Sequence, residues 1–300
     1  MLKKIIKLCL VCVVGILLVP SQVKAVVSPD LTVGGITVDT SNQDNVIGDT
    51  ITGKVSYSDG VLTLENATID NLNNNLFYGI NCNHDLTINL IGVNKIGRSL
   101  GTGSLNSVVY GISCYNSGTT ENEKITFTGD GSLTIYDNNK GVLCENFSGE
   151  LGDNGSLTIY DYGAEGVECG ISGRTGVFKS GNYNISSQLS AGLMFDTLRY
   201  EGGNLVLSID QDDTRDIVIC DDLTIVPTNV KAKASTNPDG SDPVDYNVED
   251  LSTYKYLSFT LKTPTNTGDT TSPWLYVSVT CFALAVLLII FGIKNRKRNK

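Results

Sequence analysis

The feature that most constrains this chain is an internal repeat. The heptapeptide GSLTIYD at residues 131–137 recurs unchanged at residues 155–161, and looser copies begin at Gly181 and Gly203. A second series, with the pattern Gly-Ile/Val-x-Cys, runs alongside the first. Its four copies end at Cys82, Cys114, Cys144 and Cys169. Both series advance by 22–32 residues per step, a period typical of folds in which one supersecondary unit stacks on the next.

Each copy has the chemistry of short β-strands. Apolar residues alternate with polar ones, and Gly, Asn, Asp and Ser separate the segments, as in strands joined by tight turns. No window of the body shows the 3.6-residue period of an amphipathic helix. A pair of strands cannot bury its apolar side alone, whereas stacked coils share one core. The repeat therefore predicts an all-β parallel β-helix of about seven coils over residues 58–226.

The segments beside the repeat are expected to close its two ends. Residues 26–57 are predicted to cap the first coil, because an open solenoid end exposes unpaired strand edges. Residues 227–262 contain a turn-rich loop and then an alternating segment, Tyr254–Leu261, which predicts a closing strand. Residues 263–273 are predicted to be a spacer.

Two apolar segments at the chain ends indicate export and anchoring. One follows three lysines and precedes Val23-Lys24-Ala25, which predicts a signal peptide over residues 1–25, cleaved after Ala25. The other, residues 274–293, has no charge and is followed by a basic tail over residues 294–300. It predicts a transmembrane helix with a cytoplasmic tail. The body is therefore expected at the cell surface, attached to the plasma membrane or the cell wall.

Charge and composition exclude several classes of function. The segment from Asp30 to Asp269 contains all 32 acidic residues but only 13 of the 22 basic ones, a net charge of −19. Such a body repels phosphates, so nucleic-acid binding is excluded. His84 is the single histidine, which leaves nucleophilic catalysis without a base.

The cysteines of the body are predicted to face the interior in one register. Steps of one period connect Cys82, Cys114, Cys144, Cys169, Phe195 and Cys220. Neighbouring rungs about 4.8 Å apart permit disulfides, although five cysteines leave at least one thiol free. The phenylalanine on one rung favours the simpler interpretation, in which the cysteines are small buried hydrophobes.

Residues 60–69 (GVLTLENATI) and 78–88 (YGINCNHDLTI) carry a resemblance to a known family. Over roughly residues 31–262 the chain resembles the secreted carbohydrate-binding β-helix domains of Gram-positive bacterial surfaces. The resemblance implies a right-handed parallel β-helix, binding of plant-type or acidic polysaccharides, and calcium bridging the coils.

The C-terminus is similar to a cell-wall sorting signal. The sequence Pro-Thr-Asn-Thr-Gly at residues 264–268 stands where that signal has Leu-Pro-x-Thr-Gly, but the Leu is missing and one extra residue separates Pro from Thr. If a sortase accepts the motif, the bond between Thr267 and Gly268 is cut and Thr267 joins the wall. The alternative is anchoring by the helix alone.

The outward side of the repeated heptapeptides is the candidate ligand-binding surface. Alternation points Thr134, Tyr136, Thr158 and Tyr160 outward, with the two rings on neighbouring rungs. Aromatic rings beside hydroxyl groups suit a sugar. The alternative is that Thr and Tyr are present as good β-formers that only stabilise the sheet.

Three aspartates near these strands are candidate calcium ligands. Asp137 and Asp161 follow the two tyrosines one rung apart, and Asp153 could add a further oxygen. A Ca²⁺ ion between the paired carboxylates would remove their repulsion. The alternative is that these are ordinary polar turn residues with no bound metal.

We therefore expect a non-catalytic, surface-displayed protein that binds a polysaccharide or another cell-surface glycan, or that acts as an adhesin. One alternative is a pectate-type polysaccharide lyase, for which Arg174 and Lys179 are the candidate bases. A second alternative is a structural spacer or a protein-binding surface.

Overall fold

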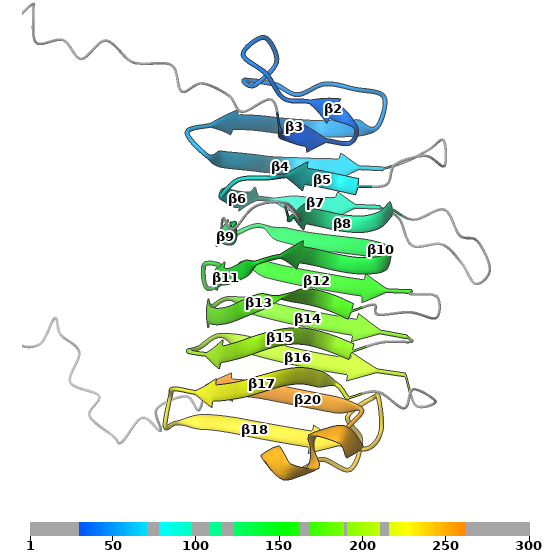
Figure 1. The fold of residues 1–300 in the computed structure, drawn as a ribbon, viewed down its shortest axis with the longest axis vertical. Coiled ribbons are helices and arrows are strands. Elements are labelled where there is room, and N and C mark those ends of the chain that lie inside the picture. The colour runs from blue at the N-terminus through cyan, green and yellow to red at the C-terminus, as the bar shows by residue number, and fades with distance from the viewer. Residues whose placement is uncertain are drawn as a thin grey trace, which may run out of the picture. The chain divides into compact units, whose positions relative to one another are not determined.

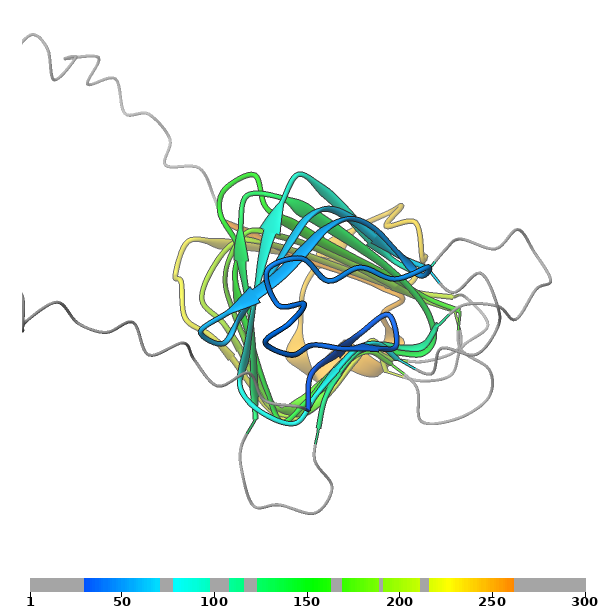
Figure 2. The same cartoon turned by 90° about the horizontal axis from the view of Figure 1, so that it is seen from above.

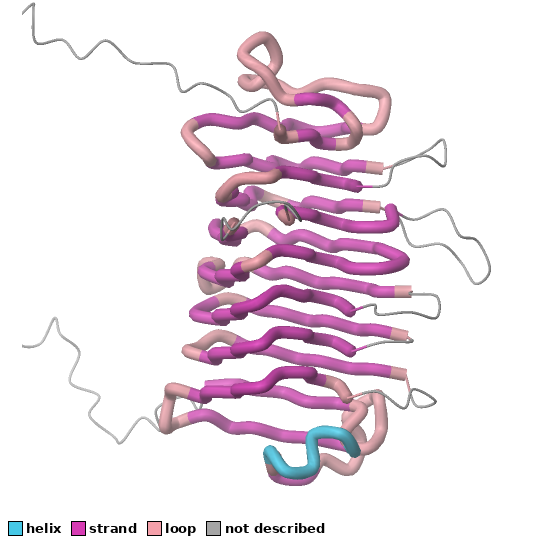
Figure 3. The backbone as a smooth tube through the Cα atoms, viewed as in Figure 1, coloured by secondary structure: helices cyan, strands magenta, loops and turns pink. Residues whose placement is uncertain are grey.

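The computed structural model describes residues 30–70, 78–97, 108–115, 123–162, 169–188, 191–210 and 216–261. This part is almost entirely β-strand, with one short 3-10 helix, η1 (Val248–Thr253), near its C-terminal end (Figure 3). The strands stack into a β-solenoid of about five turns (Figure 1). The predicted all-β solenoid is thus confirmed, whereas the predicted count of seven coils is not.

The strands of the N-terminal half are β1 (Thr32–Val33), β2 (Ile36–Thr37), β3 (Ile51–Ser58), β4 (Val61–Ile69), β5 (Tyr78–Cys82), β6 (Leu86–Ile91), β7 (Val93–Ile96), β8 (Val108–Cys114), β9 (Lys124–Gly129) and β10 (Ser132–Cys144). Those of the C-terminal half are β11 (Asn146–Glu150), β12 (Ser156–Asp161), β13 (Cys169–Ser180), β14 (Asn182–Ser187), β15 (Ala191–Tyr200), β16 (Asn204–Ile209), β17 (Val218–Ile225), β18 (Val230–Ser235), β19 (Val244–Asp245) and β20 (Tyr256–Leu261).

Each turn has three strands, rather than the pair predicted. Face 1 stacks β4, β6, β9, β11 and the second parts of β13, β15 and β17. Face 2 stacks the end of β4, β7, the first part of β10, β12, β14 and β16. Face 3 stacks β5, β8, the second part of β10 and the first parts of β13, β15 and β17. Viewed along the stack, successive turns superimpose around a shared interior (Figure 2).

The repeated heptapeptides are the rungs of face 2. β10 pairs in parallel with β12, residue for residue, from Ser132–Ser156 to Asp137–Asp161. β12 pairs with β14 and β14 with β16 in the same way. Their inward residues, such as Leu157 and Ile159, are completely buried, as the alternation predicted.

The ends of the stack pair differently from its middle. At the N-terminal end, β3 pairs antiparallel with β4, and β1 pairs antiparallel with β5. At the C-terminal end, β20 lies antiparallel between β16 and β18. These end elements close the core through antiparallel pairing instead of adding parallel turns.

A column of glycines sets the register of face 3. Its members are Gly79, Gly111, Gly141, Gly170 and Gly192, each facing the next across the parallel ladder. A Cβ at Gly111 would lie 2.3 Å from Cγ2 of Ile135 and 2.5 Å from the carbonyl oxygen of Gly141. The first four positions of the column therefore have no room for a side chain, because an isoleucine of face 2 fills the space at each of them.

The glycine column corrects the predicted register of the cysteines. Cys82, Cys114 and Cys144 do face one another on successive rungs, followed by Gly173, Phe195 and Cys220. Cys169 instead pairs with Lys140, because Gly170 rather than Gly166 joins the glycine column. The placement of all five cysteines in one column was therefore wrong for Cys169.

Two of these cysteines form a disulfide. Cys82 and Cys114 are bonded, with Cα atoms 4.7 Å apart, so the interpretation of the whole series as small buried hydrophobes was wrong for this pair. It fits Cys144, which is a free, buried thiol on the next rung. Burial raises the pKa of that thiol, which keeps it neutral and unreactive.

We predict that loss of this disulfide costs about 2–4 kcal/mol of the free energy of unfolding, because the bond closes a loop in the unfolded chain. The sequence separation of the pair is 32 residues. Urea unfolding of the Cys82→Ala/Cys114→Ala double variant measures the loss. The control is Cys220→Ala, which removes a partly exposed free thiol and is expected to cost less than about 1 kcal/mol. An equal cost for both variants would contradict the prediction.

The predicted signal peptide, the processing positions Ala25, Thr267 and Gly268, and the predicted transmembrane segment lie outside the described residues. Within the described ranges, no helix has both the length and the apolar character needed to cross a bilayer. Residues 262–300 belong to a separate unit of the chain.

Candidate functional site

The outward surface of face 2 carries no charge over four consecutive rungs. Its side chains are hydroxyl, amide and aromatic groups with a single valine, and all are half-buried or exposed. They are Ser132, Thr134, Tyr136, Ser156, Thr158, Tyr160, Asn182, Asn184, Ser186, Asn204, Val206 and Ser208. Face 1, in contrast, carries ion pairs such as Lys179–Glu150 and Arg199–Glu201. In a body with a net charge of −19, this neutral surface suits an uncharged, hydroxyl-rich ligand.

The predicted tyrosine pair does come together. The rings of Tyr136 and Tyr160 stack with their centroids 5.3 Å apart and their planes 13° apart, beside Thr134 and Thr158 in the adjacent column. Partial burial raises the pKa of the Tyr136 phenol, and electrostatic interactions with Tyr160 and Tyr162 raise it further. Its hydroxyl therefore stays protonated and able to donate at neutral pH. Tyr162, which the sequence analysis did not single out, continues the outward alternation two residues after Tyr160.

The stacking changes which ring surface faces a ligand. Neighbouring strands are about 4.8 Å apart, which is too close for two tyrosine rings to lie side by side in the plane of the sheet. The two rings therefore stack face to face. Tyr136 therefore covers one face of the Tyr160 ring. The next residue in the column is Ser186, which is too small to cover the other face. A sugar is expected to stack there, rather than on a flat pair of rings.

Tyr136 and Tyr160 begin a column of residues that face one another across neighbouring strands, here called the tyrosine column. The column continues with two serines and ends in a third aromatic residue. Ser186 pairs with Ser208, and Ser208 faces Tyr256 on the antiparallel strand β20. The sequence analysis did not single out either serine, although the offsets of 26 and 22 residues between the repeat copies, applied to Tyr160, lead to both of them. The position of Tyr256 could not be inferred in this way, because β20 does not belong to the repeat.

A hollow of about 380 Å³ lies where face 2 meets the C-terminal loop. It is lined by Ser186, Ser187, Gln188, Ser208, Ile209, Asp210, Pro238 and Asp239. Two of these residues are the serines of the tyrosine column. The hollow is thus continuous with the candidate ligand surface.

Two of the three candidate calcium ligands, Asp153 and Asp161, are not brought together. Asp161 is 1% exposed and its Oδ2 accepts a hydrogen bond of 2.8 Å from Oγ of Ser187. Asp153 is exposed, before the opposite end of β12. The extended chain of β12 separates the two by roughly 16 Å, whereas oxygens on one Ca²⁺ lie within roughly 5 Å of each other. Asp137 pairs with Asp161 through the backbone; its side chain lies outside the described atoms.

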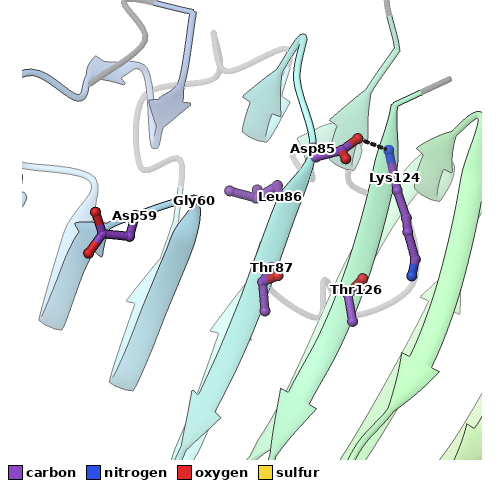
Figure 4. A pocket seen from close by; sticks show the side chains of 7 residues that line it. All are labelled: Asp59, Gly60, Asp85, Leu86, Thr87, Lys124 and Thr126. Carbon is purple, nitrogen blue, oxygen red and sulfur yellow. Dashed lines mark hydrogen bonds between the residues drawn. The ribbon is translucent and has the colours of Figure 1, made fainter. Parts of the chain in front are cut away.

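A second hollow, of about 340 Å³, lies on face 1 (Figure 4). Thr87 and Thr126 face each other across β6 and β9 on its floor, with Asp59 and Lys124 at its edges. The Asp85 carboxylate accepts a hydrogen bond of 2.8 Å from the backbone N–H of Lys124, which fixes that edge. None of the described residues that line this hollow is aromatic, so they offer no ring on which a sugar could stack.

The candidate bases of a lyase are held in ion pairs. Nζ of Lys179 lies 2.6 Å from Oε1 of Glu150, and this hydrogen bond together with that from Ser148 lowers the pKa of Glu150. Nε of Arg174 lies 3.7 Å from Glu145. Neither residue lies on the outward surface of face 2.

No family model, curated protein or solved structure matches the chain.

Proposed function

We propose that this protein is a non-catalytic glycan-binding or adhesive module displayed on a bacterial cell surface, with the outward side of face 2 as its binding surface. The observation that carries the proposal is the stacked pair Tyr136–Tyr160 beside two threonines on an uncharged surface. An aromatic ring contacts the C–H groups of a sugar, while neighbouring hydroxyls and amides satisfy its hydroxyl groups.

The proposal is tested by binding of the full-length protein to a glycan array. We expect retention on at least one polysaccharide, and a loss of about tenfold or more in affinity for Tyr160→Ala. The chain offers a matched control, because Tyr78 and Tyr110 stack on face 3 with centroids 5.2 Å apart. Tyr78→Ala should leave binding unchanged. Equal effects of the two variants, or no retention of the folded protein on any glycan, would refute the proposal.

Calcium is expected to make no contribution to this binding. The Asp161 carboxylate faces the interior and accepts a hydrogen bond from Ser187, so it is not presented to a ligand on the outer surface. A chelator added to the same array should leave retention unchanged. Calcium-dependent retention would indicate a different binding surface.

A further inference from the structure

We propose that the hollow at the C-terminal end of face 2 is a subsite for the uncharged terminal sugar of a glycan chain that lies along this face. The inference rests on the proposed function and specifies both the ligand class and the part of the ligand that is recognised. It follows from three properties of the hollow: its place in the tyrosine column, its lining, and the loop that closes it.

The hollow lies between two aromatic residues of the tyrosine column, Tyr160 and Tyr256. From Tyr160 the column passes Ser186 and Ser208 and reaches Tyr256 after three strand spacings, roughly 14 Å. Both serines line the hollow. A sugar stacked on the free face of Tyr160 therefore lies over Ser186, and the next sugar of the same chain lies over Ser208, inside the hollow.

The lining selects an uncharged sugar. Ser186, Ser208 and Gln188 offer hydroxyl and amide groups, and the carboxylates of Asp210 and Asp239 accept hydrogen bonds from sugar hydroxyls. Hydrogen bonds from the backbone N–H and the side chain of Ser241 lower the pKa of Asp239, so this carboxylate stays ionised. Among the described residues that line the hollow, none is a lysine or an arginine. A sugar carrying a carboxylate would therefore meet the two like charges of Asp210 and Asp239, with no cation in the described lining to offset them.

A fixed loop closes the far side of the hollow. Pro238 and Asp239 form this wall, and the loop is held by hydrogen bonds from the Ser241 N–H to Oδ1 of Asp239 (2.9 Å) and from Nδ2 of Asn237 to Oγ of Ser241 (2.9 Å). Behind it, Gly240 packs against the ring of Tyr256, where a Cβ would lie only 3.0 Å from the ring. The wall stops a chain from continuing along face 2, so the hollow receives a chain end.

The test uses six-residue gluco-, manno- and galacto-oligosaccharides and isothermal titration calorimetry with the full-length protein. Each sugar is supplied unmodified, with a carboxylate on a terminal residue at either end, and with the same carboxylate on an internal residue. We expect an unmodified sugar to bind. The terminal carboxylate at the recognised end should weaken that binding at least about tenfold, and the internal one less than about threefold.

A variant that fills the hollow provides the second readout. Ser208→Tyr places a ring beside Tyr256, in the arrangement that Tyr136 and Tyr160 already show, so the strand is expected to fold. It should weaken binding at least about tenfold, whereas Thr224→Tyr on face 1 should leave it unchanged.

The outcomes separate the two proposals. If Tyr160→Ala weakens binding but Ser208→Tyr does not, or if terminal and internal carboxylates act alike, the terminal subsite is overturned and the glycan-binding face stands. If no oligosaccharide binds although the array retains the protein, the terminal subsite is overturned and the glycan-binding face stands. If the array retains none of the folded protein, or Tyr160→Ala has no effect on binding, both proposals are overturned.

Discussion

Gly111→Ala is expected to lower the free energy of unfolding by about 3–4 kcal/mol, although it adds a single methyl group. The new Cβ would lie 2.3 Å from Cγ2 of Ile135 and 2.5 Å from the backbone oxygen of Gly141. Overpacking of a core costs about 1–3 kcal/mol when side chains can yield. Here the carbonyl belongs to a hydrogen-bonded rung and cannot move without breaking the ladder. Urea unfolding followed by circular dichroism measures the loss.

The same column contains the matched control. At Gly192 the nearest atoms to an added Cβ are the Ile217 oxygen at 3.2 Å and the Leu207 Cβ at 3.6 Å. Gly192→Ala should therefore change stability by less than about 1 kcal/mol, since the small crowding is offset by the better strand propensity of Ala. Equal losses for Gly111→Ala and Gly192→Ala would show that packing against face 2 does not determine this column.

The sequence was most informative where the repeat is strictest. Two identical heptapeptides predicted the register of β10 on β12, the inward position of Ile159 and the pairing of Tyr136 with Tyr160, because a period of two residues fixes which side each residue faces. Face 1 gave no such signal. Its inward residues vary from rung to rung, with Ile125 and Phe127 on one strand and Phe147 on the next, so its strands were not recognised as a third series.

The remaining differences come from contacts between distant segments. Residues 166–169 (GVEC) match the cysteine pattern, but the adjacent Gly170-Ile171 supplies the glycine that packs against Ile185, and this packing sets the register. The hollow on face 2 joins Ser208 to a loop about 30 residues further along the chain. Neither contact could be predicted from the repeat, because the segments that it joins are not related by the repeat period.

Phe147→Ala is expected to lower the free energy of unfolding by about 3–5 kcal/mol, the usual cost of truncating a fully buried Phe. Phe147 is 1% exposed. Its ring centroid lies 5.0 Å from that of Phe178, 5.7 Å from that of Phe127 and 6.4 Å from that of Tyr183. These neighbours are fixed by parallel ladders on both sides of β11, so they cannot collapse into the space that the ring leaves. Urea unfolding measures this loss.

Two further variants show whether lost packing is the cause. Phe147→Leu keeps most of the volume and should cost less than about 2 kcal/mol. Tyr136→Ala removes a stacked ring from the outer surface and should cost less than about 1.5 kcal/mol. The cluster is closely packed, since a Cβ at Gly149 on face 1 would lie 2.2 Å from the Tyr183 hydroxyl. On face 2, Tyr183 occupies the position that Leu133, Leu157 and Leu205 hold on the other rungs. If Phe147→Ala cost no more than Tyr136→Ala, the interior of the solenoid would contribute no more to stability than its surface.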